Sequence, residues 1–143
     1  MKQAMKSMMN RTKVAGYGLL SWLVPFVASL LFFGKNGQPM LPIGLIKSIM
    51  ILIGASSGGV LLFRLFRECP PSFGSGVAIG SLWFLMNILL DLSILIPMTK
   101  MNLGQYFSEI GLRYLLIPIM AGAMGAVGSQ RSYVSSQQER PIG

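Results

Sequence analysis

Residues 75–97 read SGVAIGSLWFLMNILLDLSILIP, a run in which Asp91 is the one charged side chain. A helix of this length spans about 34 Å, and about 20 apolar residues are enough to cross the roughly 30 Å hydrocarbon core of a bilayer. The run does not alternate between polar and apolar residues, as a strand of a membrane β-barrel would. The stretch therefore predicts a transmembrane helix.

Three further apolar stretches have similar lengths, at about residues 14–33, 43–66 and 107–128. The first follows a basic segment, as a signal peptide would, but its apolar run is too long and no A-x-A-like cleavage site follows, so we expect it to be retained. The chain is 52% hydrophobic and 11% charged, whereas a soluble domain carries about 25% charged residues. We predict an all-α integral membrane bundle of four transmembrane helices.

The basic residues are distributed unevenly around these stretches. If both termini are cytoplasmic, eight basic residues lie on that side: Lys2, Lys6, Arg11, Lys13, Arg64, Arg67, Arg131 and Arg140. The opposite side then holds Lys35 and Lys100. Because loops rich in Lys and Arg remain in the cytoplasm, we predict a multi-pass protein of the cell membrane with both termini cytoplasmic.

The net charge of +8 has a membrane interpretation as well. The basic residues flank apolar segments and do not form one continuous face, so we do not expect nucleic-acid binding. In this arrangement they favour contact with the lipid bilayer, and with anionic lipids at its cytoplasmic face.

The ends of the chain differ in composition from the predicted transmembrane domain, residues 14–128. Residues 1–13 are expected to be a basic cytoplasmic lead-in, either a short interfacial helix or a frayed segment. Residues 129–143 are polar and are predicted to form a disordered cytoplasmic tail.

The second half of the chain also resembles the first. A shift of 67 residues matches Ile43 with Ile110 and Gly58 with Gly125, and a weaker match places Trp22 and Trp83 at similar depth. One interpretation is two parallel helical-hairpin repeats. The other is chance similarity between spans that are rich in Gly and Leu.

Four ionisable residues are embedded in the apolar stretches, and each needs a partner, a watery cavity or a function, because a charge at the bilayer centre costs roughly 2.5–3.5 kcal/mol. Counting 1.5 Å per residue places Asp91 and Arg113 level in the outer half, which predicts an ion pair. Lys47 and Glu109 lie nearer the outer surface and predict a second pair. Asn87 lies one turn from Asp91 on the same helix face and completes the candidate polar cluster.

The inner half of the bundle is rich in small residues. Small residues four apart let helices approach closely in lipid, so we expect helix packing at these positions. The alternative is a site where a substrate approaches bare backbone. The packing candidates are Gly54, Gly58, Gly76, Gly80, Gly122 and Gly125.

The chain contains no His and one Cys, Cys69. We therefore expect no metal site and no cofactor, and we find no zinc motif, P-loop or nucleophile elbow. Enzymatic activity is not expected, although a carboxylate beside Arg and Lys is chemistry that an enzyme acting on lipid phosphate would use.

Three interpretations of the embedded charges remain. They form a closed structural network, they line a hydrated vestibule in which Asp91 binds an ion or solute, or they contact a partner membrane protein. We expect a small solute or ion transporter or a channel-like protein. Four spans make a thin wall for a pore, so we expect it to act as a homo-oligomer or with a partner membrane protein. The alternative is a non-transporting subunit or assembly factor of a larger membrane complex.

Overall fold

The computed structural model describes residues 2–68 and 72–138, and the side chains of residues 11–68, 72–130, 133 and 134. Cys69 and the last five residues lie outside these ranges. Within them the protein is helical, with an isolated bridge between Phe33 and Pro39. Four helical segments are long and apolar enough to cross a membrane, which confirms the prediction of four spans at that level: Arg11–Leu31, Ile43–Glu68, Phe73–Thr99 and Gly111–Gln130.

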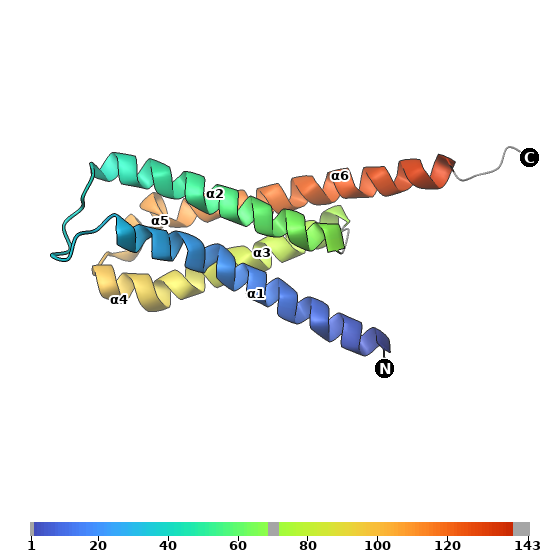
Figure 1. The fold of residues 1–143 in the computed structure, drawn as a ribbon, viewed down its shortest axis with the longest axis horizontal. Helices are drawn as coiled ribbons and strands as arrows, with labels where there is room; N and C mark the ends of the chain where they lie inside the picture. The colour runs from blue at the N-terminus through green and yellow to red at the C-terminus, as the bar shows by residue number, and fades with distance from the viewer. Residues whose placement is uncertain (1, 69–71, 139–143) are drawn as a thin grey trace, which may run out of the picture.

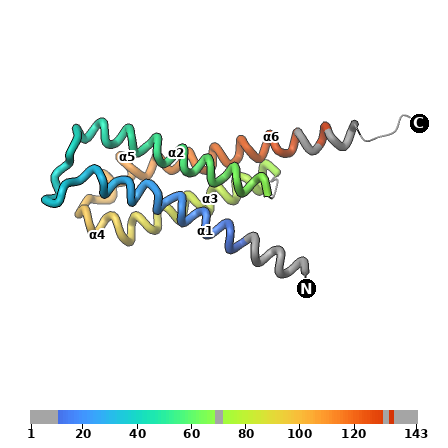
Figure 2. The backbone as a smooth tube through the Cα atoms, in the orientation of Figure 1, coloured from blue at the N-terminus to red at the C-terminus, as the bar shows by residue number. Residues whose placement is uncertain are grey.

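The helices form an elongated bundle (Figure 1). Helix α1 (Lys2–Leu31) and helix α2 (Ile43–Glu68) run side by side from the loop that joins them, as the tube in Figure 2 shows. Gly37 in that loop has φ +69°, a conformation that glycine adopts without strain. The described ends of α1 and α6 (Leu116–Gln138) lie at the same end of the bundle as the connection between α2 and α3 (Phe73–Leu90).

The third span changes its helical geometry at Asp91. After α3 the chain continues as a π-helical turn, η1 (Asp91–Leu95), in which the N–H of Ile96 donates to the carbonyl of Asp91. It then forms α4 (Ile96–Thr99) and ends at Lys100, whose φ of +54° is left-handed. Single π-turns inside α-helices are frequent at functional sites. The π-turn therefore makes Asp91 and its neighbours a candidate functional site.

The fourth span begins differently from the prediction, which placed one continuous helix over residues 107–128. Helix α5 (Leu103–Glu109) is capped by Asn102 and ends at Ile110, where φ is −125°. A 3-10 turn, η2 (Gly111–Leu115), then leads into α6. A Cβ on Gly111 would lie 2.8 Å from the ring of Phe107, so a larger residue there would require the ring to move. The apolar span therefore starts at Gly111.

Both end helices are longer than the apolar stretches. Helix α1 starts at Lys2 and runs without a break into the first span, so residues 2–13 form the first part of that helix. Helix α6 continues to Gln138, nine residues beyond residue 129, where the predicted disordered tail starts. Neither extension contains Pro or Gly, and Met, Lys, Gln and Arg favour helix, so nothing in these segments stops the helices.

The closest helix packing is between α3 and α6. A Cβ on Gly76 would lie 2.5 Å from the carbonyl oxygen of Ala121, and one on Gly80 would lie 2.6 Å from Cα of Pro118. The buried core beside this contact consists of Leu62, Leu65, Phe66, Trp83, Ile117 and Ala121. Large apolar side chains such as Leu52 and Ile119 point outward instead, at 67% and 65% exposed. This outward apolar surface is consistent with contact with a lipid bilayer.

Candidate functional site

Among the described residues, Asp91 is the one buried Asp, Glu, Lys or Arg side chain, at 2% exposed. It is the first residue of η1, and its own N–H donates to the carbonyls of Asn87 and Ile88. A carboxylate in this position has lost its hydration and requires hydrogen-bond donors from the protein.

Three neutral donors surround the Asp91 carboxylate. Nε1 of Trp22 donates to Oδ1 at 2.6 Å. The hydroxyl groups of Tyr106 and Tyr114 donate to Oδ2 at 3.0 and 2.7 Å. The donors come from α1, α5 and η2, so this one carboxylate joins three segments to the third span. We call these four residues the Asp91 centre.

The expected ion pair between Asp91 and Arg113 is not formed, since the described residues hold no salt bridge between them. The reason is angular: neighbouring residues in a helical turn point in directions about 100° apart or more. Tyr114 faces Asp91, so Arg113 faces elsewhere. The side chain of Arg113 is half-buried, and its charge still acts electrostatically on both Tyr114 and Glu109.

The second expected ion pair is confirmed. Nζ of Lys47 lies 2.9 Å from Oε2 of Glu109, with the two side chains 39% and 31% exposed. The hydrogen bond from Lys47 lowers the pKa of Glu109, aided by a hydrogen bond from Gln105 and by the positive charge of Arg113. This pair is solvent-accessible and is separate from the Asp91 centre.

Tyr106 lies just outside the apolar spans and is fully buried. Burial, together with the charge of Asp91 and the hydrogen bond to it, raises the pKa of Tyr106 above its ordinary value. Its hydroxyl therefore keeps its proton and remains a donor to the carboxylate.

Asn87, one turn before Asp91, is fully buried and is held in a fixed orientation. Its Nδ2 donates to Oγ of Ser21 at 3.2 Å and to the carbonyl of Trp83 at 2.7 Å. Its Oδ1 is buried and has no hydrogen-bond partner within the described part of the chain. An unsatisfied acceptor of this kind costs free energy unless something supplies a donor.

Helices α1 and α3 are parallel, because successive contacts rise together along both. Nε1 of Trp83 donates to the carbonyl of Val14, Asn87 contacts Ser21, and Asp91 contacts Trp22. Trp22 thus lies beside a residue eight positions beyond Trp83. The two indole N–H groups thus bind acceptors at different levels of the contact between α1 and α3, and the repeat stays a prediction.

The six glycines predicted to pack helices divide into two groups. Gly76, Gly80, Gly122 and Gly125 each face a neighbouring helix so closely that a Cβ would lie 2.5–3.0 Å from it. Gly58 is buried but only reaches Met120 at 4.0 Å, and Gly54 has nothing within 4 Å. Close packing is therefore a property of α3 and α6, and the Gly54 surface of α2 is not used within one chain.

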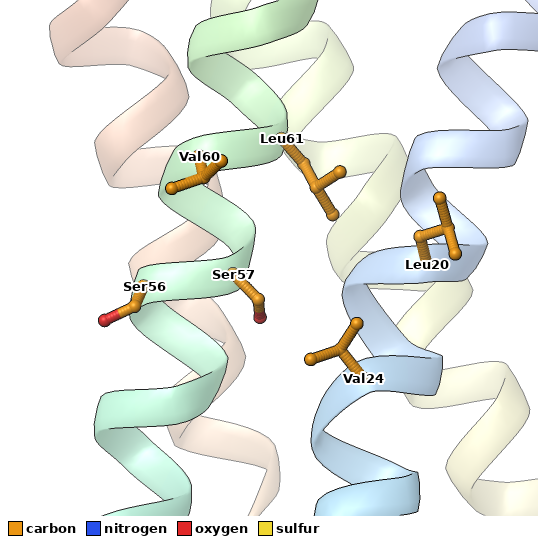
Figure 3. A pocket seen from close by; sticks show the side chains of 6 residues that line it. All are labelled: Leu20, Val24, Ser56, Ser57, Val60 and Leu61. Carbon is orange, nitrogen blue, oxygen red and sulfur yellow. The ribbon is translucent and has the colours of Figure 1, made fainter.

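A pocket of about 340 Å³ lies between α1 and α2 (Figure 3). Its lining is Leu20, Val24, Ser56, Ser57, Val60 and Leu61. The hydroxyl of Ser57 is already bonded to the carbonyl of Gly54. The pocket includes no residue of the Asp91 centre, so it is not a binding cavity for that carboxylate.

Sequence reasoning identified Asp91 and Asn87 but missed Trp22, Tyr106, Tyr114 and Ser21. A signal for the three aromatic residues exists, because a Tyr or Trp that is buried usually directs its O–H or N–H to an acceptor. A comparison with protein-family models, curated proteins and solved structures found no match to this chain.

Proposed function

We propose that this chain is a small solute or ion transporter, or a channel-like protein, in which Asp91 is the ion-responsive group. The observation that supports this is a buried carboxylate that accepts hydrogen bonds from three neutral donors and has no salt bridge to any described side chain. Ionisable residues within membrane spans are rare, and they mark ion pathways and proton relays. The π-helical turn that starts at Asp91 agrees with a functional position.

The proposal includes a location and an orientation. The chain spans the cell membrane with both termini in the cytoplasm, where its flanking basic residues lie near anionic lipids. The arrangement in Figure 1 supports a common side for both ends, since α1 and α6 extend from the same end of the bundle. A reporter fused after Lys100 should be labelled from the outer side, and cytoplasmic labelling would reverse the orientation.

Assembly into a homo-oligomer, or with a partner membrane protein, also belongs to the proposal. The support is the surface of α2 at Gly54, whose Cβ position nothing approaches within 4 Å, and the exposed apolar side chain of Ile51, three residues away on the same face. In lipid, helices associate through small residues of this kind. Several copies would enclose a path more easily than four helices do.

The test is a flux measurement in proteoliposomes. Wild type, Asp91→Asn and the control Tyr17→Phe are reconstituted with entrapped dyes for H⁺, Na⁺ and K⁺, and osmotic shrinkage reports uncharged solutes. Wild type and Tyr17→Phe should transport at least one probe. Asp91→Asn should not, although it elutes as the same oligomer and melts cooperatively. Equal flux through Asp91→Asn would refute the role of Asp91, and no flux of any probe through wild type would refute transport.

The alternative function, a non-transporting subunit or assembly factor, is favoured by a different observation. Both carboxylate oxygens of Asp91 already have donors, and the pocket between α1 and α2 is lined by no residue of the Asp91 centre. On this alternative the Asp91 centre fixes the helices in register for a partner. It predicts no flux from wild type, together with co-purification of one stoichiometric membrane partner in mild detergent.

A further inference from the structure

The Asp91 centre contains an imbalance between acceptors and donors. A carboxylate offers about four acceptor positions, of which three are used here. One helical turn away on the same face, Oδ1 of Asn87 is a second buried acceptor, without a partner among the described residues. A metal ion, the O–H of a water molecule or a proton could satisfy these two buried acceptors.

The chemistry of the existing donors selects among these. The indole of Trp22 is a donor only, and its hydrogen is directed at Oδ1 of Asp91 from 2.6 Å. A positive hydrogen there repels a metal ion at that oxygen, and the indole offers it no lone pair. A proton needs neither extra ligands nor extra volume, because it joins the carboxylate itself.

Protonation also corrects the imbalance. A carboxylic acid has one O–H donor, which a carboxylate lacks. Nδ2 of Asn87 is fixed by Ser21 and Trp83, so the Oδ1 atom is directed away from those two groups. An O–H on Asp91, one turn further along α3, would supply the donor that this oxygen lacks.

We propose that Asp91 is a proton-binding site whose acid form donates to Oδ1 of Asn87 and whose anionic form is held by Trp22, Tyr106 and Tyr114. The step is a simple transfer: hydronium gives one proton to the carboxylate and leaves as water, and one O–H bond forms. This inference rests on the proposed function for its consequence, which is that the coupled ion is H⁺. The binding site itself is tested separately from transport.

The charged and titratable neighbours of Asp91 are few. Tyr106 from α5 and Tyr114 from η2 contact it, and α1 contributes only the neutral Trp22 and Ser21. Arg113 lies beside Tyr114, and the Lys47–Glu109 pair from α2 and α5 forms no salt bridge with Asp91. Of the three donors, Tyr114 is half-buried, whereas Trp22 and Tyr106 are buried.

The experiment is a pH series of infrared spectra of the reconstituted protein, recorded for wild type and for Asp91→Asn. The carboxylates of Glu68, Glu109 and Glu139 are present in both proteins, so the difference isolates Asp91. As pH falls, the wild type should gain the carbonyl band of one buried carboxylic acid, and Asp91→Asn should not. A band that survives in Asp91→Asn, or its absence from wild type at every pH where the protein stays folded, would overturn the proposal.

Two further variants test the roles of the neighbours. Tyr114→Phe removes a donor to the anion, so the midpoint of the Asp91 titration should rise by about one pH unit or more, a tenfold gain in proton affinity. The control Tyr17→Phe should leave it unchanged. Asn87→Leu removes the acceptor, and the acid carbonyl band should move to higher frequency. An unmoved midpoint in Tyr114→Phe or an unmoved band in Asn87→Leu contradicts the assigned partners.

The two proposals can fail independently. Titration of Asp91 without flux in proteoliposomes would refute transport and leave the proton site in place. Flux of Na⁺ or K⁺ through a protein whose Asp91 does not titrate would refute the proton site and leave transport in place.

Discussion

Replacement of Gly80 by alanine tests the contact between α3 and α6. The new Cβ would lie 2.6 Å from Cα of Pro118 and 2.8 Å from Cβ of Ala121, whereas carbon atoms in ordinary contact are about 3.5–4.0 Å apart. The obstruction includes backbone, so a change of rotamer cannot relieve it. The helices must move apart by about 1 Å, and overpacking of this kind typically costs about 1–3 kcal/mol.

Gly54→Ala is the matched control, because nothing lies within 4 Å of its Cβ position. Alanine favours helix over glycine by roughly 1 kcal/mol at either site, so this gain cancels when the two variants are compared. The difference in the free energy of unfolding between them should therefore be the packing term alone, about 1–3 kcal/mol in favour of Gly54→Ala.

The assay is equilibrium unfolding in mixed detergent micelles with increasing SDS, followed by circular dichroism. Gly80→Ala should unfold at a lower SDS fraction than wild type, and Gly54→Ala at the same fraction or a higher one. Equal midpoints for the two variants would show that α3 and α6 do not pack through Gly80. If Gly54→Ala is instead destabilised at a protein concentration that favours oligomers, and not under dilution, its surface contacts a second copy.

Two further predictions concern the polar residues. Tyr114→Phe should lower the free energy of unfolding by about 1.5–3 kcal/mol, since it removes a hydrogen bond to a charge. Arg113→Gln should lower it by less than about 1 kcal/mol. If the SDS titration gives the reverse order, the predicted Asp91–Arg113 ion pair would be supported. Because the folded-state pKa of Glu109 lies below its unfolded value, the Lys47–Glu109 pair stabilises the protein above the unfolded pKa and loses this effect as pH falls through the folded one. The melting temperatures of wild type and Glu109→Gln should therefore differ slightly at neutral pH and converge in acid; a gap that widens in acid would contradict this sign.

The positions of the four spans could be predicted because the length of an apolar run is enough to locate a membrane-spanning helix. The loss of regular helix at Asp91 and at Ile110 could not, because it depends on contacts between segments. The Phe107 ring lies against Gly111 at the break, and the π-turn at Asp91 occurs where three other segments supply donors. The donors to Asp91 come from other segments, and the apolar pattern of residues 107–128 does not show how the Phe107 ring packs against Gly111.

The embedded charges show the same limit. Counting residues gave the depth of each charge, and depth was sufficient for Lys47 and Glu109, whose long side chains reach each other near the surface. It failed for Asp91 and Arg113 because depth does not fix the direction in which a side chain points. One residue further along, Tyr114 occupies the place that the prediction gave to Arg113.

The π-turn at Asp91 also has a consequence for how this span can vary in length. A π-turn accommodates about one more residue than an α-helical turn does, so everything beyond it is rotated by about 100° relative to a continuous α-helix. Different side chains of Ile96–Thr99 therefore face the neighbouring helices than would do so if α3 continued as a regular α-helix. A single deletion within residues 92–95 would return the span to α-helical periodicity with its chemistry intact. A related chain whose third span is one residue shorter at this point would be expected to lack the π-turn.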